Sequence, residues 1–211
     1  MERLELLSRQ SLADAIEFDI ASSPYFLVTY HPVTLSSEDQ AKPVAEMIGA
    51  IAEFADHKII FTGVNSDPGN SDLSEAITTF TRSSGSNAIF RNSLGQVRYL
   101  SAMKYAAAVI GNSSSGIVEA PALAVPTVNL GERQRGRIRA ASVVDCTEDQ
   151  GSIKKAIETV LDPEFMAAAK TVEYPFGTPG AARRICETLA ATNFADILMK
   201  RFYDLPAEAR A

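Results

Sequence analysis

Short apolar runs alternate along the chain with longer segments of helical periodicity, and polar turns separate the two. The apolar runs are rich in β-branched and aromatic residues, which predicts strands. They cover residues 25–31, 58–64, 87–90, 106–110, 126–130 and 141–146. Their apolar residues are continuous rather than alternating, which is typical of strands covered on both faces.

The segments between these strands repeat apolar residues every three or four positions, which predicts helices with one buried face. The expected helices cover residues 11–20, 36–55, 73–82, 95–104, 117–124, 147–161, 163–170, 181–191 and 194–202. Alternating strands and helices with short connections predict an α/β fold, a doubly wound, parallel, Rossmann-like sheet of about six strands with helices on both faces. Ligands of such sheets bind beyond the carboxyl ends of the strands, where the strand order reverses.

The turn after the fourth predicted strand has the chemistry of an anion-binding site. Residues 111–116 read GNSSSG and lead into the helix expected at 117–124. Free N–H groups and the helix dipole both favour a phosphate at a helix N-terminus. Glu119 falls in the first turn of the expected helix, within reach of a sugar hydroxyl. The alternative is an ordinary helix start, because Ser and Asn are common N-caps.

Composition excludes several function classes. The 211 residues suffice for one domain with its own core, and a net charge of −6 argues against the basic face that nucleic acids require. No apolar stretch approaches the roughly 20 residues of a membrane span, and the N-terminus lacks an apolar signal core. The two cysteines have no metal-ligand spacing and indicate reduced thiols in a cytoplasmic protein. We expect no metal, no cofactor, no nucleic acid and no membrane partner.

Several segments together closely resemble the hydrolysing UDP-N-acetylglucosamine 2-epimerases. They are YHPVT at residues 30–34, GNSSSGIVEAP at 111–121, PTVNLGERQRGR at 126–137 and SVVDC at 142–146. The resemblance covers almost the whole chain but only the C-terminal half of the family. It implies the C-terminal half of a B-type glycosyltransferase fold, with residues 1–20 as a linker helix and 192–211 as a closing amphipathic helix. The family's active site lies between two domains.

The resemblance also implies roles for particular residues. His31 matches a histidine that lies against the diphosphate and the reacting sugar, where an imidazolium would oppose the charge on departing UDP or give it a proton. Ser113 and Ser114 match residues that hold the phosphates. Glu119 matches the carboxylate that accepts the ribose hydroxyls, and an ionised acceptor makes the stronger bond.

Other matched residues surround this set: Arg133 near the substrate, Asn65 and Asp67 in a turn near the nucleotide, and Arg91 near the base. Arg133 belongs to a segment that is basic and poor in apolar residues, which alone would indicate a solvated loop. His57 is expected at an exposed helix end and receives no role. One departure is that residues 176–180 read FGTPG, where the family commonly has Tyr-Gly-Asp-Gly, so the acidic residue is absent.

The family reaction eliminates UDP across C1–C2 of UDP-N-acetylglucosamine, and water then adds to give N-acetylmannosamine for sialic acid synthesis. The carboxylates for the proton transfers at C2 come from the family's N-terminal domain. We therefore expect the UDP-binding half of such an enzyme, inactive without its missing domain. The unpartnered apolar face of the closing helix would also allow a homo-oligomer. Two alternatives stay open: a related UDP-sugar epimerase or glycosyltransferase of the same fold, and a non-catalytic nucleotide-sugar sensor.

Overall fold

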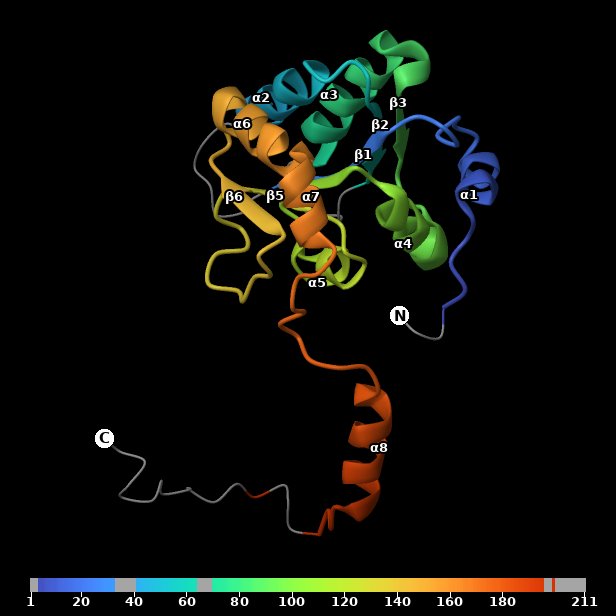
Figure 1. Ribbon diagram of the computed structural model, residues 1–211, viewed down its shortest axis with the longest axis vertical. Coiled ribbons are helices and arrows are strands. Elements are labelled where there is room, and N and C mark those ends of the chain that lie inside the picture. The colour runs from blue at the N-terminus through green and yellow to red at the C-terminus, as the bar shows by residue number, and fades with distance from the viewer. Residues whose placement is uncertain (1–3, 33–40, 64–69, 196–198, 200–211) are drawn as a thin grey trace, which may run out of the picture. The chain divides into compact units, whose positions relative to one another are not determined.

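Six parallel strands form one sheet in a computed structural model that describes residues 4–32, 41–63, 70–195 and 199 (Figure 1). The strands are β1 (Tyr25–Thr29), β2 (Lys58–Thr62), β3 (Ala88–Arg91), β4 (Ala108–Gly111), β5 (Thr127–Leu130) and β6 (Val143–Cys146). Their order across the sheet is β3-β2-β1-β4-β5-β6, and every neighbouring pair is parallel. This confirms the predicted doubly wound sheet.

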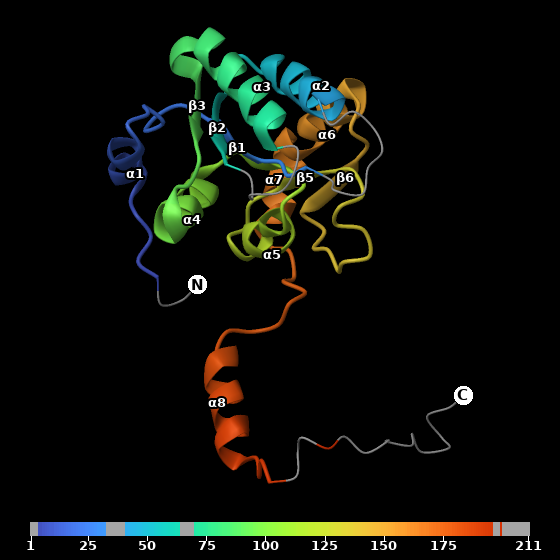
Figure 2. The same ribbon diagram turned by 180° about the vertical axis from the view of Figure 1, so that it is seen from behind.

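Helices cover both faces of this sheet (Figures 1 and 2). One face carries α2 (Ala41–Ala52), α3 (Asn70–Ser83) and α6 (Gln150–Leu161), and α7 (Pro163–Ala169) follows α6. The other face carries α1 (Arg9–Ile16), α4 (Gly95–Tyr105) and α5 (Ser114–Ala122). A short 3₁₀ turn, Gly85–Asn87, precedes β3. Two compact units divide at Phe176, and the second contains α8 (Ala181–Ala191), which has no buried side chain.

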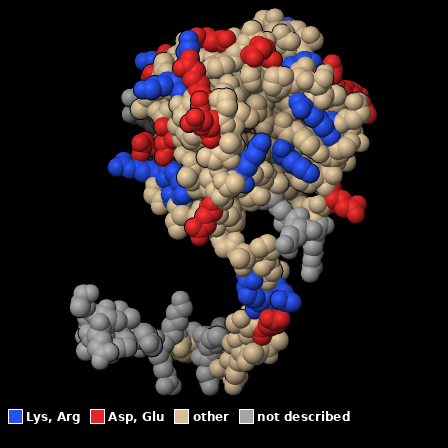
Figure 3. Space-filling model, viewed as in Figure 1, with Lys and Arg blue, Asp and Glu red and all other residues tan. Residues whose placement is uncertain are grey.

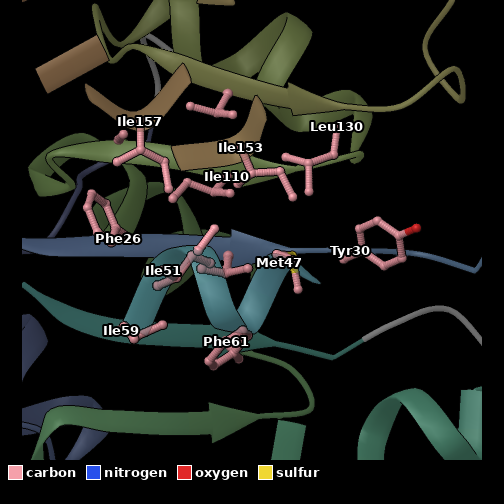
Figure 4. Packing of buried hydrophobic residues seen from close by; sticks show 14 of the residues in the cluster. Phe26, Tyr30, Met47, Ile51, Ile59, Phe61, Ile110, Leu130, Ile153 and Ile157 are labelled. Carbon is pink, nitrogen blue, oxygen red and sulfur yellow. The ribbon is translucent and has the colours of Figure 1, made fainter. Parts of the chain in front are cut away.

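The strand β1 shows why the apolar runs are unbroken. Phe26 and Val28 pack into the core under α2 and α6 (Figure 4), whereas Tyr25 and Leu27 pack into the core under α1 and α4. Successive side chains of a strand point to opposite faces, so a strand with helices on both sides needs apolar residues at every position. All five residues of β1 are buried as a result.

For three of the helices that begin elsewhere than expected, the capping residue is the reason. The side chain of Ser8 accepts the Ser11 N–H and starts α1 ahead of the predicted Ser11. Ser113 caps α5, so this helix begins at Ser114 and Glu119 falls in its second turn rather than its first. Asp149 caps α6, which therefore starts at Gln150 instead of residue 147.

Other expectations fall partly outside the described residues. The predicted cap of α2 at Ser36 or Ser37 lies outside them. Residues 192–195 are not helical, and most of the remainder of the expected helix 194–202 is not described. No helix among the described residues is long and apolar enough to cross a membrane. On the face shown in Figure 3, acidic and basic side chains are interspersed.

The prediction that His57 is exposed is wrong. Its ring stacks on Phe26 with centroids 4.5 Å apart, and its side chain is only 11% exposed. Its Nδ1 lies 2.8 Å from a carboxylate oxygen of Asp56. His57 therefore closes the end of the core beyond α2. This packing role accounts for a histidine at position 57 without a functional role.

Candidate functional site

The strand order reverses between β1 and β4, with β2 and β3 on one side and β5 and β6 on the other. The register pairs Thr29 with Gly111 at the carboxyl ends of these two central strands. The segments that follow them, one beginning with Tyr30 and one with Asn112, therefore leave the sheet about 4.8 Å apart. This is the position at which open α/β sheets bind their ligands.

Glycine is required at the point where β4 ends. Gly111 has φ +134°, and a Cβ there would lie 2.0 Å from the carbonyl oxygen of Thr29. The next residue uses this close approach, since the Asn112 N–H donates to the same carbonyl at 3.2 Å. At Gly116 a Cβ would come within 2.7 Å of the Thr127 methyl, so this glycine allows α5 to pack directly on β5.

The backbone of His31 is held by a side chain from the neighbouring strand end. Asn112 Oδ1 accepts the His31 N–H at 2.7 Å, and Asn112 Nδ2 donates to the His31 carbonyl at 2.8 Å. Asn112 is fully buried and His31 is 7% exposed. These two bonds join the His31 backbone to the residue immediately before Ser113.

The N-terminus of α5 provides hydrogen-bond donors at the same place. Ser113 is the N-cap, and its Oγ accepts the Ser115 N–H. The N–H of Ser114, the first helical residue, has no intrahelical acceptor. The Ser114 side chain is exposed and that of Ser113 is half-buried. Together with the helix dipole, these groups form a site suited to a phosphate.

The arginine-rich segment reaches this turn. Arg133 Nη1 and Gln134 Nε2 both donate to the carbonyl of Asn112, at 3.0 Å and 2.8 Å. Gln134 is only 2% exposed. Arg139 donates to the Asp145 carboxylate at 2.9 Å and to the Gln134 carbonyl at 3.0 Å. The solvated loop that composition alone would indicate is therefore not what the structure has at Gln134, which is buried, or at Arg139, which is half-buried. Arg133 stays exposed while it bonds the Asn112 carbonyl.

A hydrogen bond between Tyr30, just after β1, and Glu148, just after β6, lies beside the start of the same loop. Tyr30 donates its hydroxyl proton to Glu148 Oε1 at 2.6 Å, and Tyr30 is 2% exposed. Burial, together with this carboxylate, raises the pKa of Tyr30 far above its usual range. A Cβ at Gly131, where φ is +64°, would lie 2.7 Å from the Glu148 carboxyl carbon. The close approach of this carboxyl group therefore requires glycine at the loop's first position.

Glu119 is half-buried on α5, and its charge acts on two tyrosine side chains. Burial is the main reason that the pKa values of Tyr99 and Tyr174 are raised, and the nearby Glu119 charge adds to both. Tyr174 also packs against Phe176, with ring centroids 5.5 Å apart. The carboxylate therefore lies near Tyr99 of α4 and near Tyr174.

The chain matches the model for UDP-N-acetylglucosamine 2-epimerases over residues 2–190. It belongs to the UDP-N-acetylglucosamine 2-epimerase family. It is 32% identical over 207 residues to the polysialic acid biosynthesis protein P7 of Escherichia coli, covering 96% of this chain and 51% of that protein. It is 31% identical over 206 residues to the GDP/UDP-N,N'-diacetylbacillosamine 2-epimerase (hydrolyzing) of Campylobacter jejuni, covering 97% and 53%.

Solved epimerases share the fold. The UDP-GlcNAc 2-epimerase of Neisseria meningitidis bound to UDP-GlcNAc superposes with a TM-score of 0.70 at 17% identity, covering 87% of this chain and 49% of that one. The Methanocaldococcus jannaschii UDP-GlcNAc 2-epimerase, in complex with UDP-GlcNAc and UDP, gives 0.62 at 21% identity, covering 86% and 51%. The chain thus spans about half the length of the relatives that it matches.

Not every residue matched to the epimerase family lies near the turn that follows β4. Arg91 pairs with Thr62 in the register, two strands away from β1. Its Nη2 donates to the carbonyl of Ile16 at the end of α1, at 2.7 Å. Strand spacing puts its Cα on the order of 14 Å from Gly111, so the structure does not bring it to the turn. Asn65 and Asp67 lie outside the described residues. All three roles stay predictions.

Five residues that build this candidate site were not expected there from the sequence: Tyr30, Tyr99, Asn112, Gln134 and Glu148. For Asn112 a local signal exists, because it lies in the GNSSSG turn between the end of the strand and the helix cap. The other four depend on contacts between distant segments, for which local spacing gives no signal. No cluster of His, Cys, Asp or Glu in the described ranges is arranged to hold a metal ion.

Proposed function

We propose that this chain is the UDP-binding half of a hydrolysing UDP-N-acetylglucosamine 2-epimerase. The observation that carries the proposal is the double hydrogen bond between Asn112 and His31. It places the histidine segment next to the phosphate-binding N-terminus of α5 at the reversal of strand order. The hydrolysing activity named for the Campylobacter jejuni relative, and the sialic acid polymer named for the Escherichia coli relative, support this assignment.

The diphosphate would lie at the start of α5. The Ser114 N–H and the Ser113 hydroxyl are donors there, and the helix dipole adds favourable potential. Arg133 uses one guanidinium N–H for the Asn112 carbonyl and keeps others for a phosphate oxygen. The Glu119 carboxylate, farther along α5, would accept the ribose hydroxyls.

His31 would act on the leaving group. In the elimination, the C1–O bond to UDP breaks, a base removes the C2 proton, and a C1–C2 double bond forms. Water then adds at C1, and a proton returns to C2 with the opposite configuration. An imidazolium at His31 would oppose the charge developing on the diphosphate or donate a proton to it.

The base that acts at C2 would come from the other half of the enzyme. The relatives are about twice as long as this chain, so we propose that the chain binds nucleotide but needs a second domain for turnover. Release of N-acetylmannosamine from UDP-N-acetylglucosamine by the chain on its own would overturn this part of the proposal.

A calorimetric titration with UDP, with CMP and GDP as comparisons, tests the binding. We expect UDP to bind and Glu119→Ala to abolish the binding, because the ribose loses its charged acceptor. Glu158→Ala, an exposed site on α6, is the matched control and should bind as the wild type does. Failure of the wild type to bind UDP would refute the proposal.

A second candidate is an epimerase of another nucleotide-linked 2-acetamido sugar. The relative with 31% identity is named for GDP/UDP-N,N'-diacetylbacillosamine, which favours this reading. Binding of GDP as tight as that of UDP would support it over the first candidate.

A further inference from the structure

A row of five hydroxyl groups runs from β2 to the N-terminus of α5. Thr62 Oγ1 lies 2.6 Å from Thr29 Oγ1, which lies 3.3 Å from the Tyr99 hydroxyl oxygen. The Tyr99 oxygen lies 2.6 Å from Ser115 Oγ, and Ser115 Oγ donates to Ser113 Oγ at 3.0 Å. The groups come from β2, β1, α4 and α5, so four elements meet at the phosphate-binding turn.

The number of protons available fixes the direction of hydrogen-bond donation along this row. Each hydroxyl has one proton to donate. Ser115 gives its proton to Ser113, so the short contact between Tyr99 and Ser115 requires the Tyr99 proton. Thr29 must then donate to Tyr99, and Thr62 to Thr29. The other acceptor near the Thr62 hydroxyl is a backbone carbonyl at 3.4 Å, much farther than the 2.6 Å to Thr29.

All donations therefore run toward Ser113. Its oxygen receives the Ser115 hydroxyl proton and also the Ser115 N–H at 3.4 Å. Across the described ranges, the structure shows no acceptor for the proton of Ser113 itself. With its lone pairs occupied from inside the protein, the Ser113 hydroxyl can act only as a donor to what lies outside.

We propose that this row orients the Ser113 hydroxyl as a proton donor to the bound phosphate, with Tyr99 as the positioning residue at its centre. The inference rests on the proposed function, since the phosphate is that of the nucleotide. A row of hydroxyls that all donate in the same direction also polarises its last member, which strengthens the outward bond.

The environment of Tyr99 fits this role. The side chain is half-buried between α4 and the sheet, and burial raises its pKa. The hydroxyl therefore keeps its proton at neutral pH and can donate to Ser115. A phenylalanine would fill the same volume but could not donate to Ser115. The bond between Ser115 and Ser113 could then reverse, with Ser113 donating its proton to Ser115 instead of to the phosphate.

The test uses the full chain and two probes that represent the two ends of the nucleotide, pyrophosphate and uridine. We expect Tyr99→Phe to weaken pyrophosphate binding about tenfold and to leave uridine binding unchanged. Tyr25→Phe is the matched control, because it removes a buried tyrosine hydroxyl outside the row, one that donates to the Ala102 carbonyl at 2.7 Å. It should leave pyrophosphate affinity unchanged.

A double-mutant cycle with Ser113→Ala separates positioning from general structural damage. If Tyr99 acts through Ser113, Tyr99→Phe has no further effect on pyrophosphate affinity in the Ser113→Ala background. Additive losses, an equal loss of uridine binding, equal pyrophosphate affinity in wild type and Tyr99→Phe, or no pyrophosphate binding by the wild type would each overturn the inference. The proposed function fails separately, if pyrophosphate binds but UDP binds no more tightly than pyrophosphate.

Discussion

Asn112 and His31 exchange two hydrogen bonds, side chain to backbone, across 81 positions of sequence. The carbonyl of Asn112 also accepts bonds from Arg133 and Gln134. One buried residue thus holds together the end of β1, the start of the α5 turn and the arginine-rich loop. Each of these three segments carries a residue that we propose contacts the nucleotide.

Replacing Asn112 by alanine should lower both stability and order at the site. The His31 N–H and carbonyl would stay buried without these partners, at a cost of about 2–5 kcal/mol in the free energy of unfolding. Urea unfolding measures the loss. Asn92→Ala, at an exposed position, is the control and should change stability little. A stability of Asn112→Ala equal to that of the control would contradict the role of the two Asn112–His31 hydrogen bonds.

NMR signals of the histidine rings report whether the Asn112→Ala change is local to the site. The chain has two histidines, so NMR of the ring signals resolves His31 beside His57. Asn112→Ala should move the His31 signals and leave those of His57, stacked on Phe26, where they are. Equal shifts in both rings would indicate a change of the whole fold instead.

Two glycines with positive φ should respond differently to alanine. Gly111→Ala places a Cβ 2.0 Å from a backbone carbonyl, and both φ and contact oppose it. Gly85→Ala has a similarly unfavourable φ of +57° but open space around the Cβ. We expect Gly85→Ala to cost about 1–2 kcal/mol, the strain alone, and Gly111→Ala to cost several times more or to prevent folding. Similar unfolding midpoints would contradict the close approach at Gly111.

Cys146 should resist alkylation while Cys186 reacts. Burial, with help from the carboxylates of Asp145, Asp149 and Glu148, raises the pKa of Cys146 from the ordinary 9.0 to about 12. Its thiolate population at pH 8 is then roughly a thousandfold below that of an ordinary thiol. Cys186 is exposed on α8. Peptide mass spectrometry after brief iodoacetamide treatment should find Cys186 labelled first, and Cys146 only after unfolding. Equal rates would show that Cys146 is accessible and ionised.

Asp149 should make the stability of the fold depend on pH in the acidic range. Hydrogen bonds from Thr147 and from the Ser152 N–H lower its pKa from 3.8 to about 2. A carboxyl whose pKa is lower in the folded state stabilises the fold above its unfolded pKa. That contribution is lost as the pH falls from about 4 to about 2. Thermal unfolding of Asp149→Asn, which keeps a capping oxygen without a charge, should show a weaker pH dependence in this window. An unchanged profile would contradict the prediction.

The strands and the site turn could be predicted because their signals are local. The apolar run of β1 requires only that both faces be covered, and the sequence GNSSSG marks the turn directly. Helix starts were less predictable, since either Ser113 or a later residue can cap α5, and this choice moved Glu119 by a turn. The burial of His57 could not be foreseen, because it depends on Phe26 from a distant strand. The same holds for the contacts of Gln134 and Arg139 in a segment whose composition indicates a loop.

The loop from Gly131 to Arg139 is attached to the strand ends at both of its ends and at Gln134, and it is exposed between residues 135 and 138. The Gly131 N–H donates to the Cys146 carbonyl at 2.9 Å, and Arg139 bonds the Asp145 carboxylate, so both ends are tied to β6. Between them, Gly136 has open space around it and Ile138 is 65% exposed. Residues 135–138 are therefore the place where extra sequence, such as a fluorophore tag or a longer natural insert, would leave the strand ends undisturbed while reporting directly on events at the neighbouring turn.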